Sequence, residues 1–186
     1  MHNNKSTNST KKIALAAVLT AGGVVFLFAG SVLQVVDLSA AALAGFAVAL
    51  SVIEIGGKYP VLVYLAVSLI SVLILPNRLP AVLFIAFGGL YPLFKAQFER
   101  YHPVVAWVLK FSMFNIVLWL LIFFIGFLTG QELMSLSERM DFLGYFTIVA
   151  FLLGNLVFLL YDIVMTKLII LYMVKIRKIL KLENYF

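Results

Sequence analysis

The chain has 186 residues, of which 64% are hydrophobic and 12% charged, with a net charge of +6 and no cysteine. A soluble domain is about half apolar and about a quarter charged, so this chain lacks the polar surface needed to cover a globule in water. The composition predicts a protein whose solvent is mostly lipid, and the missing cysteines exclude disulfides, thiolate metal sites and thiol nucleophiles.

Six apolar segments approach or exceed the roughly 20 residues that a membrane-spanning helix needs. In chain order they cover residues 13–36, 38–55, 59–75, 79–94, 104–128 and 143–171. The first segment is longer than the apolar run of a signal peptide and no A-x-A site follows it, which favours a retained helix. The expected fold class is all-α and integral to the membrane, a compact bundle of six transmembrane helices.

Turn residues separate the segments. Asp37 interrupts the first pair, "EIGGKYP" separates the second from the third, and "LPNRLP" and "QFERYHP" end the next two. Proline can open a helix but cannot continue one, so Pro80 and Pro103 are expected near helix starts. The resulting domains are a polar leader at 1–12, a transmembrane domain at 13–174 and a basic tail at 175–186.

Basic residues in short loops favour the cytoplasmic side of a membrane. With six spans and a cytoplasmic N-terminus, all of the 14 basic residues except Arg78 and Arg139 fall in cytoplasmic segments, Lys95 among them, or in cytoplasmic helix ends. We therefore expect a multi-pass protein of the cell membrane with both termini in the cytoplasm. The lipid bilayer accounts for the basic charge, so no nucleic-acid partner is expected, and the tail "KIRKILK" is typical of a segment that lies on an anionic leaflet.

Motifs for catalysis are missing from the sequence. "EIGGKYP" is not a phosphate loop, because Tyr59 and not Ser or Thr follows Lys58. The two histidines, His2 and His102, form no H-E-x-x-H motif, and there is no G-x-S-x-G. We expect no enzyme, no metal site and no cofactor.

Polar residues inside apolar spans are the usual indication of function in a membrane protein. Asn115 and Asn155 lie near the middle of the fifth and sixth segments, at similar depth in antiparallel helices. One interpretation, which we favour, is an interhelical hydrogen bond; the other is the polar floor of a ligand cavity. Lys110 and Asp162 also share a depth, and an ion pair is favoured there over a proton relay.

The outer face offers a second group of candidates. Asn77 and Arg78 lie in a tight outer loop, with Trp119 and Tyr145 in the outer half of the membrane or at its edge. One interpretation is an interfacial belt of aromatic and basic residues. The functional interpretation is an outward-facing pocket with a polar mouth and aromatic walls. Its candidate substrate-binding residues are Asn77, Arg78, Asn115, Trp119, Tyr145 and Asn155; neighbouring outer loops add Gln34, Asp37, Gln131 and Glu132.

Small residues are concentrated in the first two segments. In the first, one stripe contains Ala14, Ala17 and Ala21, and an adjacent stripe contains Ala16, Thr20 and Gly23. The second segment has its own small stripe, made up of Ala40, Ala44, Ala47 and Ser51. Small residues at this spacing let helix backbones approach closely in lipid. We expect one stripe to join the two helices and the other to receive a partner.

These features resemble the substrate-binding (S) components of energy-coupling factor transporters, which are compact six-helix membrane proteins. The shared features are the short polar leader, the basic pair Lys11–Lys12 and an Ala-rich first helix with an A-x-x-x-A motif, here Ala17 to Ala21. The resemblance implies a partner interface at Ala17 and Ala21 with a transmembrane coupling subunit, which works with two ATPases. It also implies capture of a small vitamin-like solute from outside.

Two alternatives come from other classes of protein. The chain is also similar to rod-shape-determining membrane protein D, a six-helix scaffold that transports no solute. A self-contained secondary transporter is the third possibility, although the inverted repeats common in such folds are not evident between the first three segments and the last three.

Overall fold

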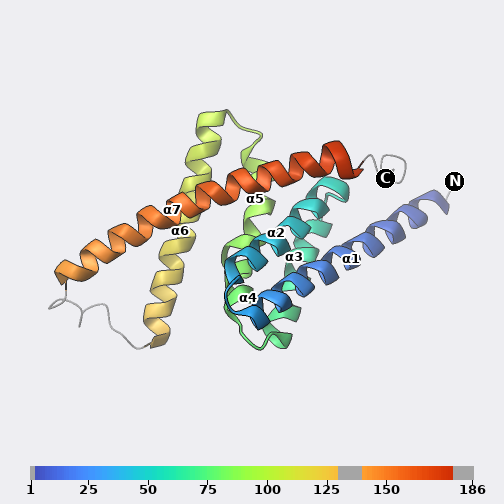
Figure 1. The fold of residues 1–186 in the computed structure, drawn as a ribbon. Helices are drawn as coiled ribbons and strands as arrows, with labels where there is room; N and C mark the ends of the chain where they lie inside the picture. Colours follow the sequence, from blue (N-terminus) through green and yellow to red (C-terminus); the bar gives the residue numbers. More distant parts are fainter. Residues whose placement is uncertain (1–2, 130–139, 178–186) are drawn as a thin grey trace. The chain divides into compact units, whose positions relative to one another are not determined.

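The computed structural model describes residues 3–129 and 140–177, without the side chains of 3–8, 122–129, 140–148, 150 and 176. All regular structure in these ranges is helical (Figure 1), so the expected all-α fold is confirmed. The elements are α1 (Asn3–Leu33), α2 (Asp37–Glu54), α3 (Tyr59–Ile74), α4 (Leu79–Leu83), the π-helix η1 (Phe84–Gly88), α5 (Leu90–Phe98), α6 (Pro103–Thr129), α7 (Met140–Leu171) and the π-helix η3 (Tyr172–Ile176).

Among the described residues, five stretches are long and apolar enough to cross a membrane. They are Ser9–Leu33, Asp37–Glu54, Leu79–Phe98, Pro103–Leu121 and Phe151–Lys175. α3 is the shorter apolar helix, with 16 residues. The chain is therefore consistent with a multi-pass membrane protein.

The helix bounds agree with the predicted segments for α2 and α3 and differ most at two other places. α1 begins at Asn3, so most of the predicted polar leader is helical. The fourth segment continues through α5 to Phe98, four residues beyond its predicted end at residue 94. Lys95 is therefore part of a helix, and its assignment to a connecting segment is wrong.

The chain forms two compact units. One contains Met1–Gln97 together with Val164–Phe186, and the other contains Phe98–Ile163. Each unit is described by itself below, and the single transmembrane domain over residues 13–174 stays a prediction.

The core of the first unit lies where α1, α2, α3, α4 and η1 meet. Its buried side chains are Leu27, Ala41, Ala44, Val48, Val63, Val67, Leu75, Ala81 and Phe84. Two of these, Ala41 and Ala44, lie on or beside the small stripe of α2, and all four members of that stripe are buried. Because small side chains allow close backbone approach, the predicted packing of the first two helices on each other is confirmed.

Glycines mark the closest approaches in this core. A Cβ atom placed on Gly30 of α1 would collide with the Cβ of Ala40, and one on Gly23 would lie 3.1 Å from Val67 Cγ2. A Cβ on Gly88 would lie 2.7 Å from the Ala41 carbonyl oxygen. Gly30 and Gly88 are thus required by contacts with α2, and Gly23 lies close against Val67 of α3.

Tight turns connect the helices of this unit. Gly56 and Gly57, between α2 and α3, have φ angles of +64° and +61°, which only glycine adopts without strain. Gln34 ends α1 at a φ of +57°. These turns allow neighbouring helices to run antiparallel with few connecting residues.

The π-helix η1 interrupts the fourth segment. The Gly89 N–H, which an α-helix would direct to Ile85, donates to the Phe84 carbonyl at 2.8 Å. The Tyr64 hydroxyl of α3 donates to the Ile85 carbonyl at 2.9 Å. In a regular α-helix the Ile85 carbonyl would accept from the Gly89 N–H. Here the Tyr64 hydroxyl of α3 takes the place of that donor, so the Ile85 carbonyl stays hydrogen-bonded.

Candidate functional site

The predicted outer loop of the first unit is fixed to α1. The Ser31 hydroxyl donates to the Asn77 carbonyl at 2.8 Å and accepts from the Asn77 N–H at 2.8 Å. The Asn77 side-chain oxygen accepts from the Leu79 N–H at 3.0 Å, at the start of α4. Asn77 thus uses its backbone and its side-chain oxygen to hold the loop beside the end of α1.

Arg78 is the exposed basic residue of this loop. Asp37, at the first position of α2, is half-buried, and its Oδ1 atom has no hydrogen-bond partner among the described residues. α2 and the 75–78 loop both lie at the end of α1, because Ser31 joins that loop to the last turn of α1. The first unit therefore gathers a guanidinium, a carboxylate and the amide group of Asn77 at one end.

In the second unit, Asn115 of α6 and Asn155 of α7 form a reciprocal pair. Asn115 Nδ2 donates to Asn155 Oδ1 at 3.0 Å, and Asn155 Nδ2 donates to Asn115 Oδ1 at 3.1 Å. Each Nδ2 also donates, at 2.8 Å, to the carbonyl four residues earlier, at Phe111 and Phe151. The predicted interhelical hydrogen bond is confirmed.

This geometry limits what the asparagine pair could offer a ligand. An amide side chain has two N–H donors, and both donors of each residue are already used. Only lone pairs on the two Oδ1 atoms are left over. A ligand that meets the pair without breaking it would therefore have to donate hydrogen bonds, not accept them.

Of the two aromatic candidates, only the side chain of Trp119 is described by the structure. Trp119 of α6 is 58% exposed, as a side chain that faces lipid or a partner would be. The Tyr145 side chain lies outside the described residues, as do Gln131 and Glu132. Asn77 and Arg78 belong to the first unit, as do Gln34 and Asp37, whereas Asn115, Trp119, Tyr145 and Asn155 belong to the second.

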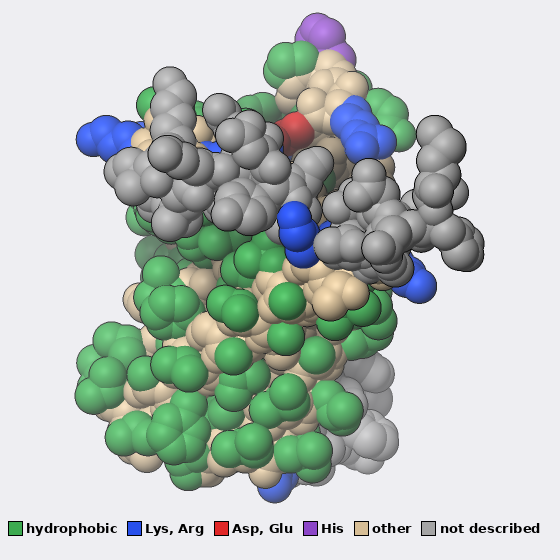
Figure 2. Space-filling view, turned by 90° about the vertical axis from the view of Figure 1, so that its right-hand side faces the viewer, with side chains coloured by type: hydrophobic (Ala, Val, Ile, Leu, Met, Phe, Trp, Pro, Cys, Tyr) green, Lys and Arg blue, Asp and Glu red, His purple; other side chains and the backbone are tan. Residues whose placement is uncertain are grey.

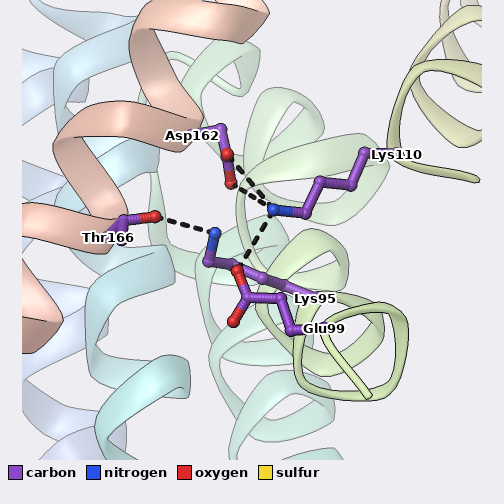
Figure 3. A network of polar contacts seen from close by, with 5 residues as sticks. All are labelled: Lys95, Glu99, Lys110, Asp162 and Thr166. Carbon is purple, nitrogen blue, oxygen red and sulfur yellow. Dashed lines mark hydrogen bonds and ion pairs between the residues drawn. The ribbon is translucent and has the colours of Figure 1, made fainter. Parts of the chain in front are cut away.

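The second unit also contains a three-residue charged cluster (Figure 3). The Lys110 Nζ lies 3.2 Å from Asp162 Oδ2 and 3.1 Å from Glu99 Oε1. It also lies 5.1 Å from the centre of the Trp107 ring, within cation–π range. The side chains of Lys110 and Asp162 are 6% and 5% exposed, whereas that of Glu99 is 47% exposed. The predicted Lys110–Asp162 ion pair is confirmed, and sequence reasoning missed Glu99 as its third member.

Two more buried charges in the first unit were missed. The Lys95 ammonium donates to the Thr166 hydroxyl at 2.9 Å (Figure 3), and Lys95 is 3% exposed. The Glu54 carboxylate, at the end of α2, lies 3.3 Å from Arg177 Nε, and its side chain is 2% exposed. Both residues stand at the boundary of an apolar segment, where sequence alone cannot separate a residue that faces headgroups from one that faces a neighbouring helix.

The predicted partner interface lies on a helix with two different faces. Ala14, Ala17 and Ala21 of α1 are exposed, together with Val18 and Val25. Gly23, Leu27 and Gly30 are buried on the opposite face. Of the two predicted stripes, the one with Gly23 packs inside the unit and the one with Ala17 and Ala21 faces outward.

Comparison of the chain with protein-family models, with curated proteins and with solved structures gives no match in any of the three. Among the described residues, no group of three or more His, Cys, Asp or Glu side chains is arranged to hold a metal ion.

Proposed function

We propose that the chain is the membrane-embedded solute-binding subunit of an ATP-driven uptake transporter of the energy-coupling factor type. The observation that supports this proposal is the division of α1 into a buried small face and an exposed small face. Gly23 and Gly30 account for contacts within the unit. The exposed Ala17 and Ala21 are not needed for those contacts.

The physical argument concerns what alanine does on a lipid-facing surface. Larger side chains transfer more favourably to lipid, so exposed alanines gain less from the bilayer than leucines would. Small residues instead permit a second helix to approach closely, which provides dispersion energy and weak backbone contacts. The exposed face of α1 is therefore suited to a transmembrane coupling subunit.

ATP hydrolysis would come from the partner module. In the sequence, the glycine turn at 56–57 does not continue as a phosphate loop. Two ATPases bound to the coupling subunit would supply the energy, as the family resemblance implies.

Solute capture is assigned to the outer side, with both termini in the cytoplasm and six spans. Arg78 is the exposed cation at that end of the first unit and is suited to an anionic group on a small vitamin-like solute. Because Ser31 holds the Asn77 loop, Arg78 is presented from a fixed backbone.

The test is a pull-down in mild detergent from native membranes, with co-purifying proteins identified by mass spectrometry. The tagged wild-type chain should bring down a coupling membrane subunit and two ATPases. Ala17→Leu/Ala21→Leu should lose them while it still inserts and elutes as a folded protein. Ala29→Leu is the matched control, because Ala29 is also exposed on α1 but lies outside the motif.

Other outcomes would overturn the proposal. Recovery of cell-shape machinery without any ATPase would favour the scaffold that resembles rod-shape-determining membrane protein D. Equal loss of partners in the Ala29→Leu control would show that Ala17 and Ala21 have no special role.

A further inference from the structure

We propose that one end of the first unit binds the headgroups of anionic phospholipids. We call this the basic end and define it by Lys11, Lys12, Lys58, Lys175 and Arg177. The inference does not depend on transport, because a scaffold could use the same contact.

Three helices bring these cations to the same end. The ion pair between Arg177 and Glu54 joins the end of η3 to the end of α2. Lys58 lies immediately beyond, in the turn that leads to α3. Two residues before Arg177 stands Lys175, which is exposed.

The start of α1 lies at the same end of the unit as the Glu54–Arg177 pair. A Cβ on Gly23 would lie 3.9 Å from the Ala44 carbonyl, which places these two residues side by side on antiparallel helices. Lys12 and Glu54 are each about ten residues from that contact, or about 15 Å at about 1.5 Å per residue. Lys11 and Lys12 therefore lie near the depth of the Glu54–Arg177 pair.

No exposed carboxylate offsets these charges among the described residues of the unit. Its acidic residues in that range are Asp37 and Glu54. Asp37 begins α2 and so lies at the opposite end, and Glu54 is buried beside Arg177. Within the described part of this unit, the basic end thus presents the exposed Lys58 and Lys175, and the unit's acidic residues lie buried or at the opposite end.

Exposed apolar side chains adjoin the cations. Ile13 follows Lys12 and is 57% exposed, and Val174 precedes Lys175 and is also 57% exposed. Beyond Lys58, the exposed residues Val61 and Leu62 continue along α3. Figure 2 shows that hydrophobic side chains cover much of one face of the chain. A phospholipid matches both parts, because its phosphate meets lysine while its acyl chains cover the apolar surface; a free anion matches only the first.

The test measures which lipids remain on the purified protein. The chain is reconstituted in an equal mixture of phosphatidylglycerol and phosphatidylcholine and extracted in mild detergent, and the two retained lipids are quantified by mass spectrometry. Phosphatidylglycerol should be enriched in the wild type. Lys58→Gln and Lys175→Gln should each lower that enrichment, with an upper bound of about fivefold, since a basic residue near an anionic surface contributes about 1 kcal/mol.

Arg78→Gln is the matched control, because it removes one positive charge from the opposite end of the unit. An equal fall in all three variants would overturn the proposal, since net charge alone would then explain the enrichment. No fall in Lys58→Gln and Lys175→Gln would also overturn it. Loss of the enrichment in excess inorganic phosphate, but not in sodium chloride of equal ionic strength, would overturn the assignment to a lipid, because ionic strength alone screens both kinds of anion.

Discussion

At the scale of single residues, the second unit places its polar side chains against one another. Lys110 meets two carboxylates and an aromatic ring, and the asparagine pair uses all its N–H donors internally. Polar groups without partners are costly in an apolar medium, so pairing is the condition under which such residues persist in lipid. Their presence in α6 and α7 is therefore explained by mutual contact before any ligand is invoked.

The two carboxylates beside Lys110 should contribute unequally. Lys110→Met should lower the free energy of unfolding by about 3 kcal/mol, because it leaves Asp162 buried without its cation. Glu99→Gln should cost less than about 1 kcal/mol, because Glu99 is 47% exposed and water replaces the lost contact. Denaturant titration in micelles measures both values. The double variant Lys110→Met/Asp162→Asn should recover part of the loss, and strict additivity of the two single effects would contradict the pairing argument.

At the scale of elements, α1 shows how one helix can serve two surfaces. Ala40 of α2 fills the space that a side chain at Gly30 would occupy, whereas a Cβ placed on Gly22 would have nothing within 4 Å. Spacing could predict that small stripes exist on α1. It could not say which stripe faces inward, because that depends on where α2 and α3 lie.

Gly30→Ala and Gly22→Ala form a matched pair on this helix. Gly30→Ala should destabilise the protein by about 1–3 kcal/mol, because the added methyl group collides with Ala40 in a packed contact. Gly22→Ala should be neutral or should stabilise by up to about 1 kcal/mol, because alanine is the better helix former and the site is open. Thermal unfolding in detergent compares the two variants. A similar loss in both would argue against close packing of α1 on α2.

At the scale of the whole molecule, run length and turn residues predicted most of the helices. α2 and α3 begin and end within one residue of the segments 38–55 and 59–75. Counting depth along antiparallel helices was enough to pair Asn115 with Asn155 and Lys110 with Asp162. The helix bounds and these two pairs follow from the lengths of the apolar runs and from the positions of the polar residues within them.

Features that depend on a third helix could not be predicted in this way. Glu54 is buried because Arg177, more than a hundred residues later, lies beside it. The π-helix η1 depends partly on Tyr64 of α3, which donates to the Ile85 carbonyl. In both cases the partner, Arg177 or Tyr64, lies in another part of the sequence, so the residues next to Glu54 or Ile85 do not reveal it.

The number of membrane crossings depends on α3. Its 16 residues extend about 24 Å at about 1.5 Å per residue, less than the roughly 30 Å of a hydrocarbon core. If α3 crosses, the chain has six spans and both termini lie on the same side. If α3 does not cross, the five longer stretches place the termini on opposite sides.

Cysteine labelling distinguishes these topologies without background, because the chain has no native cysteine. Lys58→Cys and Arg78→Cys place single thiols at the two ends of α3, and both positions are exposed. A membrane-impermeant maleimide applied to intact cells should label Arg78→Cys at once and Lys58→Cys only after permeabilisation, because basic loops favour the cytoplasm. Labelling of both thiols in intact cells would show that α3 does not cross, and the reverse pattern would place both termini outside. Only the reverse pattern would remove the outer position of Arg78 from which solute capture is argued; labelling of both thiols would instead remove the six-span topology.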